Sequence, residues 1–143
     1  MTVRRNVSVG PGGVYDLGLH LVWCPKYRRS VLTGDVGDRC EELLREKAVE
    51  HDWQVVSLQV TPDHVHLFVK TRPSDSPAYV ANQFKGYTSR VLRDEFPALK
   101  TRLPTLWSRS FFVATVGAVS AETVQRYIDT QRERPWRKNA GGE

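Results

Sequence analysis

The sequence contains few of the features that mark membrane, secreted or disulfide-stabilised proteins. No apolar run approaches the ~18 residues that span a bilayer, and the longest, 111–119, contains a threonine and a glycine. The N-terminal stretch MTVRRNVSVGPGG has no apolar segment of the kind found in signal peptides. The only cysteines, Cys24 and Cys40, have neither disulfide-framework nor zinc-site spacing. We therefore expect reduced thiols in a cytoplasmic protein that contacts no membrane.

Acidic residues are outnumbered by basic ones, 16 to 21, which gives a net charge of +5. This balance favours a polyanionic partner, with nucleic acid first, although solubilising surface charge explains it as well. The basic residues gather in two places, KYRR at 26–29 and a group near the C-terminus. The second group comprises Arg126, Arg132, Arg134, Arg137 and Lys138.

Periodicity predicts one α+β domain over residues 1–143, with a polar N-terminal arm (1–13) and a C-terminal tail (135–143). Alternating apolar residues indicate strands, and apolar residues at helical spacing indicate helices. The expected order is strand 14–24, helix 35–53, strand 54–61, strand 64–71, helix 77–96, loop 97–110, strand 111–119 and helix 120–134. Counting only helices and strands, the first six elements match a ferredoxin-like split βαβ antiparallel sheet, and the additional C-terminal helix is left over.

The stretch TPDHVHLFVK (61–70) places two of the four histidines on one strand. Side chains at i and i+2 of a strand point the same way, so His64 and His66 share a face and can converge on one metal ion. Val65, Leu67 and Val69 then form the opposite, apolar face. An ordinary polar strand face is the alternative interpretation of the pair, and Asp63 is interpreted as a turn residue.

Two tyrosine–glutamine pairs could complete such a site. Tyr127 and Gln131 lie one turn apart on the last expected helix, and Tyr79 and Gln83 have the same spacing on an earlier one. Two imidazoles with an amide oxygen would leave open positions suited to Mg²⁺ or Mn²⁺, and a tyrosine could attack a phosphorus atom there. Spacing and amphipathicity do not choose between the two pairs.

Five separated stretches in order resemble the single-tyrosine HUH transposases (TnpA proteins) of insertion sequences that transpose as single-stranded DNA. These stretches are HLVWCPKYRRSVL, TPDHVHLFV, FKGYTSRVLRDEFP, LWSRSFFVATVG and VQRYIDTQ. The resemblance implies Tyr127 as the nucleophile and His64, His66 and Gln131 as ligands of Mg²⁺ or Mn²⁺. It also implies cleavage and rejoining of single strands at the element's ends through a 5′-phosphotyrosine intermediate.

The resemblance further implies recognition of subterminal hairpins, and a homodimer in which the tyrosine helix of one subunit serves the histidine pair of the other. Candidate DNA contacts are Lys26, Arg28, Arg29, Lys85, Arg126 and Arg132. Trp107 and Trp136 are candidate stacking platforms for bases, with core packing or chance exposure as the alternative interpretation. His20 is interpreted as structural. Two alternative functions are a domesticated nuclease acting on host repeats and a non-catalytic ferredoxin-like module that binds nucleic acid.

Overall fold

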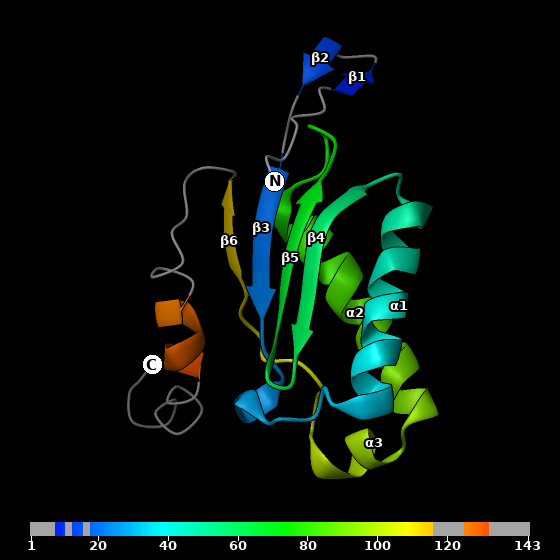
Figure 1. Cartoon of the computed structure of the whole chain (residues 1–143), viewed down its shortest axis with the longest axis vertical. Helices are drawn as coiled ribbons and strands as arrows, with labels where there is room; N and C mark the ends of the chain where they lie inside the picture. Colours follow the sequence, from blue (N-terminus) through cyan, green and yellow to red (C-terminus); the bar gives the residue numbers. More distant parts are fainter. Residues whose placement is uncertain (1–7, 11–12, 16–17, 116–124, 132–143) are drawn as a thin grey trace.

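A computed structural model of the chain describes residues 8–10, 13–15, 18–115 and 125–131 (Figure 1). In chain order its named elements are β1 (Ser8–Gly10), β2 (Gly13–Tyr15), β3 (Gly18–Trp23), the 3-10 turn η1 (Lys26–Arg28), α1 (Gly34–Glu50), β4 (Gln54–Thr61), β5 (His64–Lys70), α2 (Pro77–Glu95), α3 (Ala98–Arg102) and β6 (Phe112–Thr115). Residues 125–131 are helical, and we call them the C-terminal helix.

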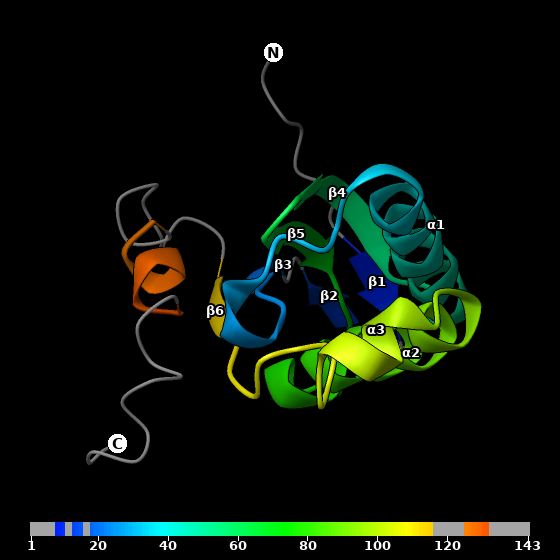
Figure 2. The ribbon, with the colours of Figure 1, turned by 90° about the horizontal axis from the view of Figure 1, so that it is seen from below.

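Four strands form one antiparallel sheet in the order β4-β5-β3-β6. With α1 and α2 inserted, the chain order β3-α1-β4-β5-α2-β6 is that of a ferredoxin-like fold. Both long helices lie on one side of the sheet, and the C-terminal helix lies near the β6 edge (Figures 1 and 2). The predicted α+β ferredoxin-like architecture is therefore confirmed.

The core lies between the sheet and the two long helices. Val65, Leu67 and Val69 of β5 are fully buried there, as the alternation predicts, and Phe84 of α2 packs with them in the same cluster. Burying such side chains contributes roughly 1.5–3 kcal/mol each. The opposite face of β5 is only half-buried. The strand is therefore fixed by its apolar face and leaves its histidine face for function.

Several boundaries differ from the sequence-based prediction. The expected strand 14–24 is divided, because Gly13–Tyr15 pairs with Ser8–Gly10 of the expected polar arm and only Gly18–Trp23 joins the main sheet. The expected loop 97–110 contains α3. This helix begins after Pro97, whose backbone angles are already helical. Of the predicted strand 111–119 and helix 120–134, the structure describes the strand Phe112–Thr115 and the helix 125–131. Residues 116–124 and 132–134 of these predictions lie outside the described residues.

β6 pairs with β3 and stands last in the strand order, so it is an edge strand of the described sheet. Within the described part of the chain, no helix is both long and apolar enough to span a membrane.

Candidate active site

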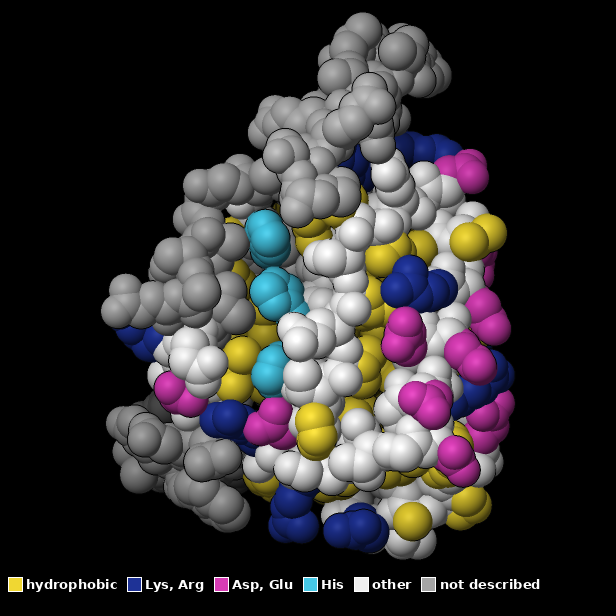
Figure 3. All heavy atoms as spheres, viewed as in Figure 1, with side chains coloured by type: hydrophobic (Ala, Val, Ile, Leu, Met, Phe, Trp, Pro, Cys, Tyr) yellow, Lys and Arg dark blue, Asp and Glu magenta, His cyan; other side chains and the backbone are white. Residues whose placement is uncertain are grey.

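The open face of the sheet carries the histidine pair. Histidine side chains form a row on this face (Figure 3), and the strand register explains it, because His66 on β5 lies opposite Val22, and Phe68 lies opposite His20. The His20 ring stacks on Phe68 at 4.6 Å between centroids and lies 5.8 Å from the His66 ring. The prediction that His64 and His66 share one face, opposite the core, is confirmed by their half-buried positions.

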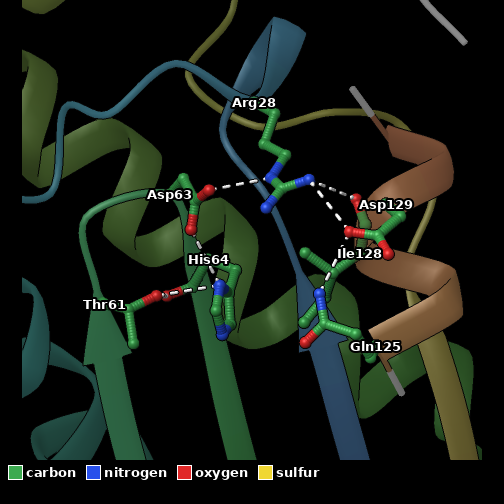
Figure 4. Close-up of polar contacts among 7 residues, drawn as sticks. All are labelled: Arg28, Thr61, Asp63, His64, Gln125, Ile128 and Asp129. Carbon is green, nitrogen blue, oxygen red and sulfur yellow. Dashed lines mark hydrogen bonds and ion pairs between the residues drawn. The ribbon is translucent and has the colours of Figure 1, made fainter. Parts of the chain in front are cut away.

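His64 is oriented by its neighbours at the β4–β5 turn. Its Nδ1 lies 2.9 Å from Oδ1 of Asp63 and 2.8 Å from Oγ1 of Thr61 (Figure 4). The Thr61 hydroxyl donates to the backbone carbonyl of His64, so its oxygen accepts from the ring. A carboxylate at Nδ1 assigns the proton to that nitrogen and leaves the Nε2 lone pair for a metal ion, as in carboxylate–histidine–metal arrangements.

The surroundings of this turn lower the pKa of both the Asp63 carboxyl and the His66 imidazole. Burial acts to raise the pKa of Asp63, but hydrogen bonds from His64 and Arg28 outweigh it, and the net pKa is lowered. Burial lowers the pKa of His66, and the nearby His20 and His64 lower it further. A neutral imidazole is the form that binds metal, so the surroundings of His66 favour ligation.

Arg28 connects the histidine turn to the C-terminal helix. Its Nε donates to Oδ2 of Asp63 at 2.8 Å, and its Nη1 donates to the Ile128 carbonyl at 3.2 Å and lies 3.6 Å from Oδ1 of Asp129 (Figure 4). Only 11% of its side chain is exposed. In this structure the guanidinium is largely buried and bonded inside the protein, and a contact of Arg28 with DNA stays a prediction.

The C-terminal helix docks on the histidine face through a small apolar cluster. Ile128 is buried against Val22 of β3, and the rings of Tyr127 and Phe112 pack at 5.7 Å. This cluster is separate from the main core. The helix that carries the predicted nucleophile therefore lies on the same side of the sheet as the histidine pair.

Two serines of the segment before β6 hold the predicted tyrosine and glutamine. The Tyr127 hydroxyl lies 3.0 Å from Oγ of Ser110. Oε1 of Gln131 accepts from Oγ of Ser108 and Ser110, both at 3.1 Å, and the side chain is 4% exposed. The Gln131 amide nitrogen has no partner among the described residues. The glutamine oxygen is thus bonded to serines, and its role as a metal ligand stays a prediction.

Lys85 has a structural position in this fold, and its role in DNA binding stays a prediction. Its ammonium donates to the carbonyls of Ser108, Arg109 and Ser110 at 2.8, 3.3 and 3.2 Å. The residue is 9% exposed, and burial lowers its pKa to about 8. A cation enclosed by three backbone carbonyls has little capacity left for phosphate, so Lys85 orders the segment that presents the two serines.

Trp107 also belongs to the interior, which corrects its predicted role as a base-stacking platform. It is 6% exposed, and its Nε1 donates to the Lys85 carbonyl and to the Thr88 hydroxyl. Its ring meets Trp23 edge-on at 5.9 Å. Trp136 lies outside the described residues.

The other candidate DNA contacts lie at the surface. Arg29 and Arg126 are exposed and Lys26 is half-buried, with the cations of Lys26 and Arg29 near the Tyr27 ring. Arg132 lies outside the described residues. These four stay predictions as DNA contacts.

The competing tyrosine–glutamine pair belongs to the helix layer, away from the histidine face. Tyr79 meets the rings of His51 and Trp53 edge-on, and Oε1 of Gln83 lies 3.2 Å from Nε2 of His51. His51 stacks on Trp53 at 4.2 Å, and Trp53 belongs to the main core. The pair therefore packs with scaffold aromatics, and this favours Tyr127 over Tyr79.

The donor set suits a divalent cation held by two imidazoles. Among the described residues, no three or more His, Cys, Asp or Glu side chains gather in a way that could hold a metal ion. A third protein ligand of such a site would therefore be of another type or come from elsewhere, and an amide oxygen would meet that need. His64 with its assigned tautomer and His66 with its lowered pKa fit the chemistry of such a site.

Sequence reasoning missed four residues of the site: Arg28 as a bridge, Asp63 as the orienting carboxylate, and Ser108 and Ser110 as partners of the C-terminal helix. The neighbouring position of Asp63 was a usable signal, because metal-binding histidines commonly pair with a carboxylate. The serines are more than fifteen residues from Tyr127, and a serine in a polar loop carries no pattern of its own.

Comparison with known proteins identifies the family. The family described as "Transposase IS200 like" matches residues 13–131. The ISDra2 transposase TnpA of Deinococcus radiodurans is 35% identical over 131 residues, covering 90% of this chain and 94% of that protein. The transposase for insertion sequence element IS200 of Salmonella typhimurium is 29% identical over 116 residues, covering 80% of this chain and 76% of the relative.

Solved structures agree with this assignment. A crystal structure of a transposase from Deinococcus radiodurans superposes with a TM-score of 0.80 at 35% identity, covering 87% of this chain and 97% of that one. A REP-associated tyrosine transposase bound to a REP hairpin superposes with a TM-score of 0.53 at 13% identity, covering 90% and 68%, which supports the fold alone. The chain is therefore a DNA transposase and belongs to the family of IS200-like transposases.

Proposed function

We propose that this transposase cleaves and rejoins single-stranded DNA at insertion-sequence ends with Tyr127 as its nucleophile. The observation that supports this most is the docking of the tyrosine helix on the histidine face, where Ile128 packs on Val22 and Arg28 bonds both to that helix and to Asp63 beside His64. No other described tyrosine–glutamine pair lies on that face.

The covalent step balances without a nucleotide cofactor. The Tyr127 oxygen forms a bond to a backbone phosphorus, the bond from that phosphorus to the 3′ oxygen breaks, and the 3′ oxygen leaves as a hydroxyl after taking up a proton. The product is a 5′-phosphotyrosine link and a free 3′-OH. Attack of a 3′-OH on the link reverses the exchange and releases the tyrosine, because the phosphodiester energy is stored in the link.

His64 and His66, with Gln131 as the third ligand, would hold Mg²⁺ or Mn²⁺ at this site. A bound cation would supply positive charge next to the phosphate oxygens, where negative charge develops. Asp63 contributes by fixing His64 with its Nε2 lone pair free. A phenol has a pKa of about 10, so Tyr127 must lose its proton as it attacks.

The proposed partners are single-stranded DNA with subterminal hairpins and a second copy of this chain. The net charge of +5 suits a phosphate backbone, with Lys26, Arg29, Arg126 and Arg132 as proposed contacts. Within one chain, Tyr127 and Gln131 bond to Ser110 and Ser108. This arrangement is compatible with a homodimer in which the helix leaves these serines and serves the partner's histidine pair.

A cytoplasmic location is proposed as well. Both thiols are buried and free, as expected in a reducing compartment.

The decisive experiment mixes the protein with a hairpin-bearing single strand and Mg²⁺ or Mn²⁺. A protein–DNA adduct that survives denaturant should form with the wild type and be absent in Tyr127→Phe. Tyr79→Phe is the matched control and should retain the adduct. An adduct that persists in Tyr127→Phe and is lost in Tyr79→Phe would move the nucleophile to α2. His64→Ala should lose the adduct and keep DNA binding, which also rejects a purely binding module.

A further inference from the structure

Arg28 lies between the histidine turn and the C-terminal helix and contacts both. One edge of its guanidinium meets Asp63, which bonds to Nδ1 of His64, and another meets the Ile128 carbonyl. Figure 4 shows the arginine between the two elements, with Asp129 of the helix beside it and Gln125 bonded to Asp129 one turn away. A single side chain thus joins a predicted metal ligand to the helix of the predicted nucleophile.

The backbone at Arg28 is in a strained, left-handed conformation. Tyr27 and Arg28 both have positive φ, 61° and 52°. Left-handed non-glycine residues cost of order 1 kcal/mol or more each and persist where the surroundings impose them. The turn is held by Lys26 N–H bonding to the Leu106 carbonyl at 2.8 Å and by a bridge between Pro25 and Trp107. The fold therefore maintains this conformation at a cost.

The shape of a guanidinium is what allows the double contact. Its donors are fixed in one plane and point in different directions, so a carboxylate and a carbonyl can be bound together with defined geometry. A lysine ammonium of similar reach carries the charge but not the planar fork. The 11% exposure of the side chain leaves both hydrogen bonds largely shielded from water.

We propose that Arg28 is a positioning residue that couples the orienting carboxylate of His64 to the docking of the C-terminal helix. Asp63 anchors Nε of Arg28, and this holds Nη1 in place for the Ile128 carbonyl. A change at the β4–β5 turn is thereby transmitted to the helix that carries Tyr127. Displacement of that helix in turn loosens the contact of Asp63 with His64. The proposal rests on the proposed function for its catalytic meaning, although the coupling itself requires neither metal nor DNA.

The test measures amide hydrogen exchange of residues 125–131 in metal-free, DNA-free protein. Arg28→Lys should speed exchange about tenfold or more, since hydrogen bonds to charged groups are among the strongest. Asp63→Asn changes only the β4–β5 turn of the protein, yet it should speed amide exchange in residues 125–131 about three- to tenfold. The double variant should match Arg28→Lys within about twofold, because coupled residues give non-additive effects.

Arg39→Lys is the matched control. Arg39 makes a two-bond pair with Glu95 at 2.9 and 3.0 Å, and it lies in the helix layer that covers the other side of the sheet from the histidine face. This variant should leave exchange at 125–131 within about twofold. Unchanged exchange in Asp63→Asn, or effects of the two site variants that simply add, would overturn the coupling, as would a control that accelerates exchange equally.

A second measurement separates positioning from contact with DNA. Arg28→Lys keeps the positive charge, so its dissociation constant for the hairpin substrate should stay within about threefold. The rate of adduct formation at saturating DNA should fall at least tenfold. Weaker binding with an unchanged rate would overturn the proposal. If the wild type forms no adduct at all, the proposed function fails, while the exchange experiment still decides the coupling.

Discussion

Replacing Lys85 with methionine should change the pH dependence of stability in a defined direction. The folded protein holds the ammonium at 9% exposure, and burial lowers its pKa from 10.5 to about 8. A difference of about 2.5 in pKa corresponds to about 3 kcal/mol, because one unit is worth about 1.36 kcal/mol. The charged form is therefore penalised in the folded state relative to the unfolded state.

The sign follows from proton binding. Between pH 8 and pH 10.5 the unfolded chain binds more protons at Lys85 than the folded chain does. The free energy of unfolding therefore rises with pH across this window, and the penalty is fully present below pH 8. Lys85→Met lacks this titration, so the wild-type value minus the variant value should rise by up to about 3 kcal/mol between pH 7 and pH 10.5.

At neutral pH two effects oppose each other in this variant. Methionine removes the three hydrogen bonds to the partly buried carbonyls of residues 108–110, and leaving a buried acceptor without a donor costs about 1–3 kcal/mol for each group. It also removes the burial penalty of about 3 kcal/mol. The net change in the free energy of unfolding at pH 7 should therefore lie between about zero and a loss of about 6 kcal/mol.

Urea unfolding of both proteins at pH 7, 8, 9 and 10 measures these differences. Lys100→Met is the matched control for losing a lysine, because Lys100 is exposed and pairs with Asp94 at the surface. A wild-type minus Lys85→Met difference that is constant over the whole range would refute the reasoning. It would mean that the three carbonyls stabilise the ammonium enough to cancel the effect of burial.

Three further outcomes are expected. Ser110→Ala removes the partner of the Tyr127 hydroxyl, so the amides of 125–131 should exchange about tenfold faster while those of β5 are unchanged, and equal rates in both proteins would contradict this role. His64→Ala should weaken Mn²⁺ binding at least tenfold by calorimetry, and chelation of the metal should abolish the wild-type adduct. Substrate binding should weaken steeply between about 50 and 200 mM salt, as for proteins that neutralise phosphates, and a salt-independent affinity would contradict a phosphate-dominated interface.

The fold was accessible from the sequence because its central strand carries a clear alternation. In HVHLFVK, Val65, Leu67 and Val69 occupy every second position and are buried, whereas the residues between them, Phe68 included, are only half-buried. The division of the first strand was not accessible. Nothing in the alternation around Tyr15 and Leu17 signals that the chain stops pairing with the main sheet and turns to Ser8–Gly10 instead.

The site was only partly accessible, for a physical reason. From the sequence alone, a charged side chain is expected at the surface. Arg28 and Lys85 are instead enclosed by hydrogen-bond acceptors that come from distant positions in the chain. Lys85 is satisfied by backbone carbonyls, and every residue has one of these, so no residue pattern marks the contact. Arg28 reaches Asp63 across 35 positions and Ile128 across 100. Both were therefore interpreted as contacts for DNA.

The separation of the two apolar clusters indicates how the helix that carries the predicted nucleophile can be displaced without unfolding the domain. The main core, between sheet and long helices, contains the large buried side chains and sets the stability of the domain. Among the described residues, the C-terminal helix contributes Ile128, whose burial against Val22 is worth roughly 1.5–3 kcal/mol, and Tyr127, which packs on Phe112. Hydrogen bonds to Arg28, Ser108 and Ser110 add to this docking, each worth about 1 kcal/mol or somewhat more. Undocking the helix would therefore leave the main core intact, and on the histidine face it would break the contact of Arg28, which also bonds to Asp63 beside His64.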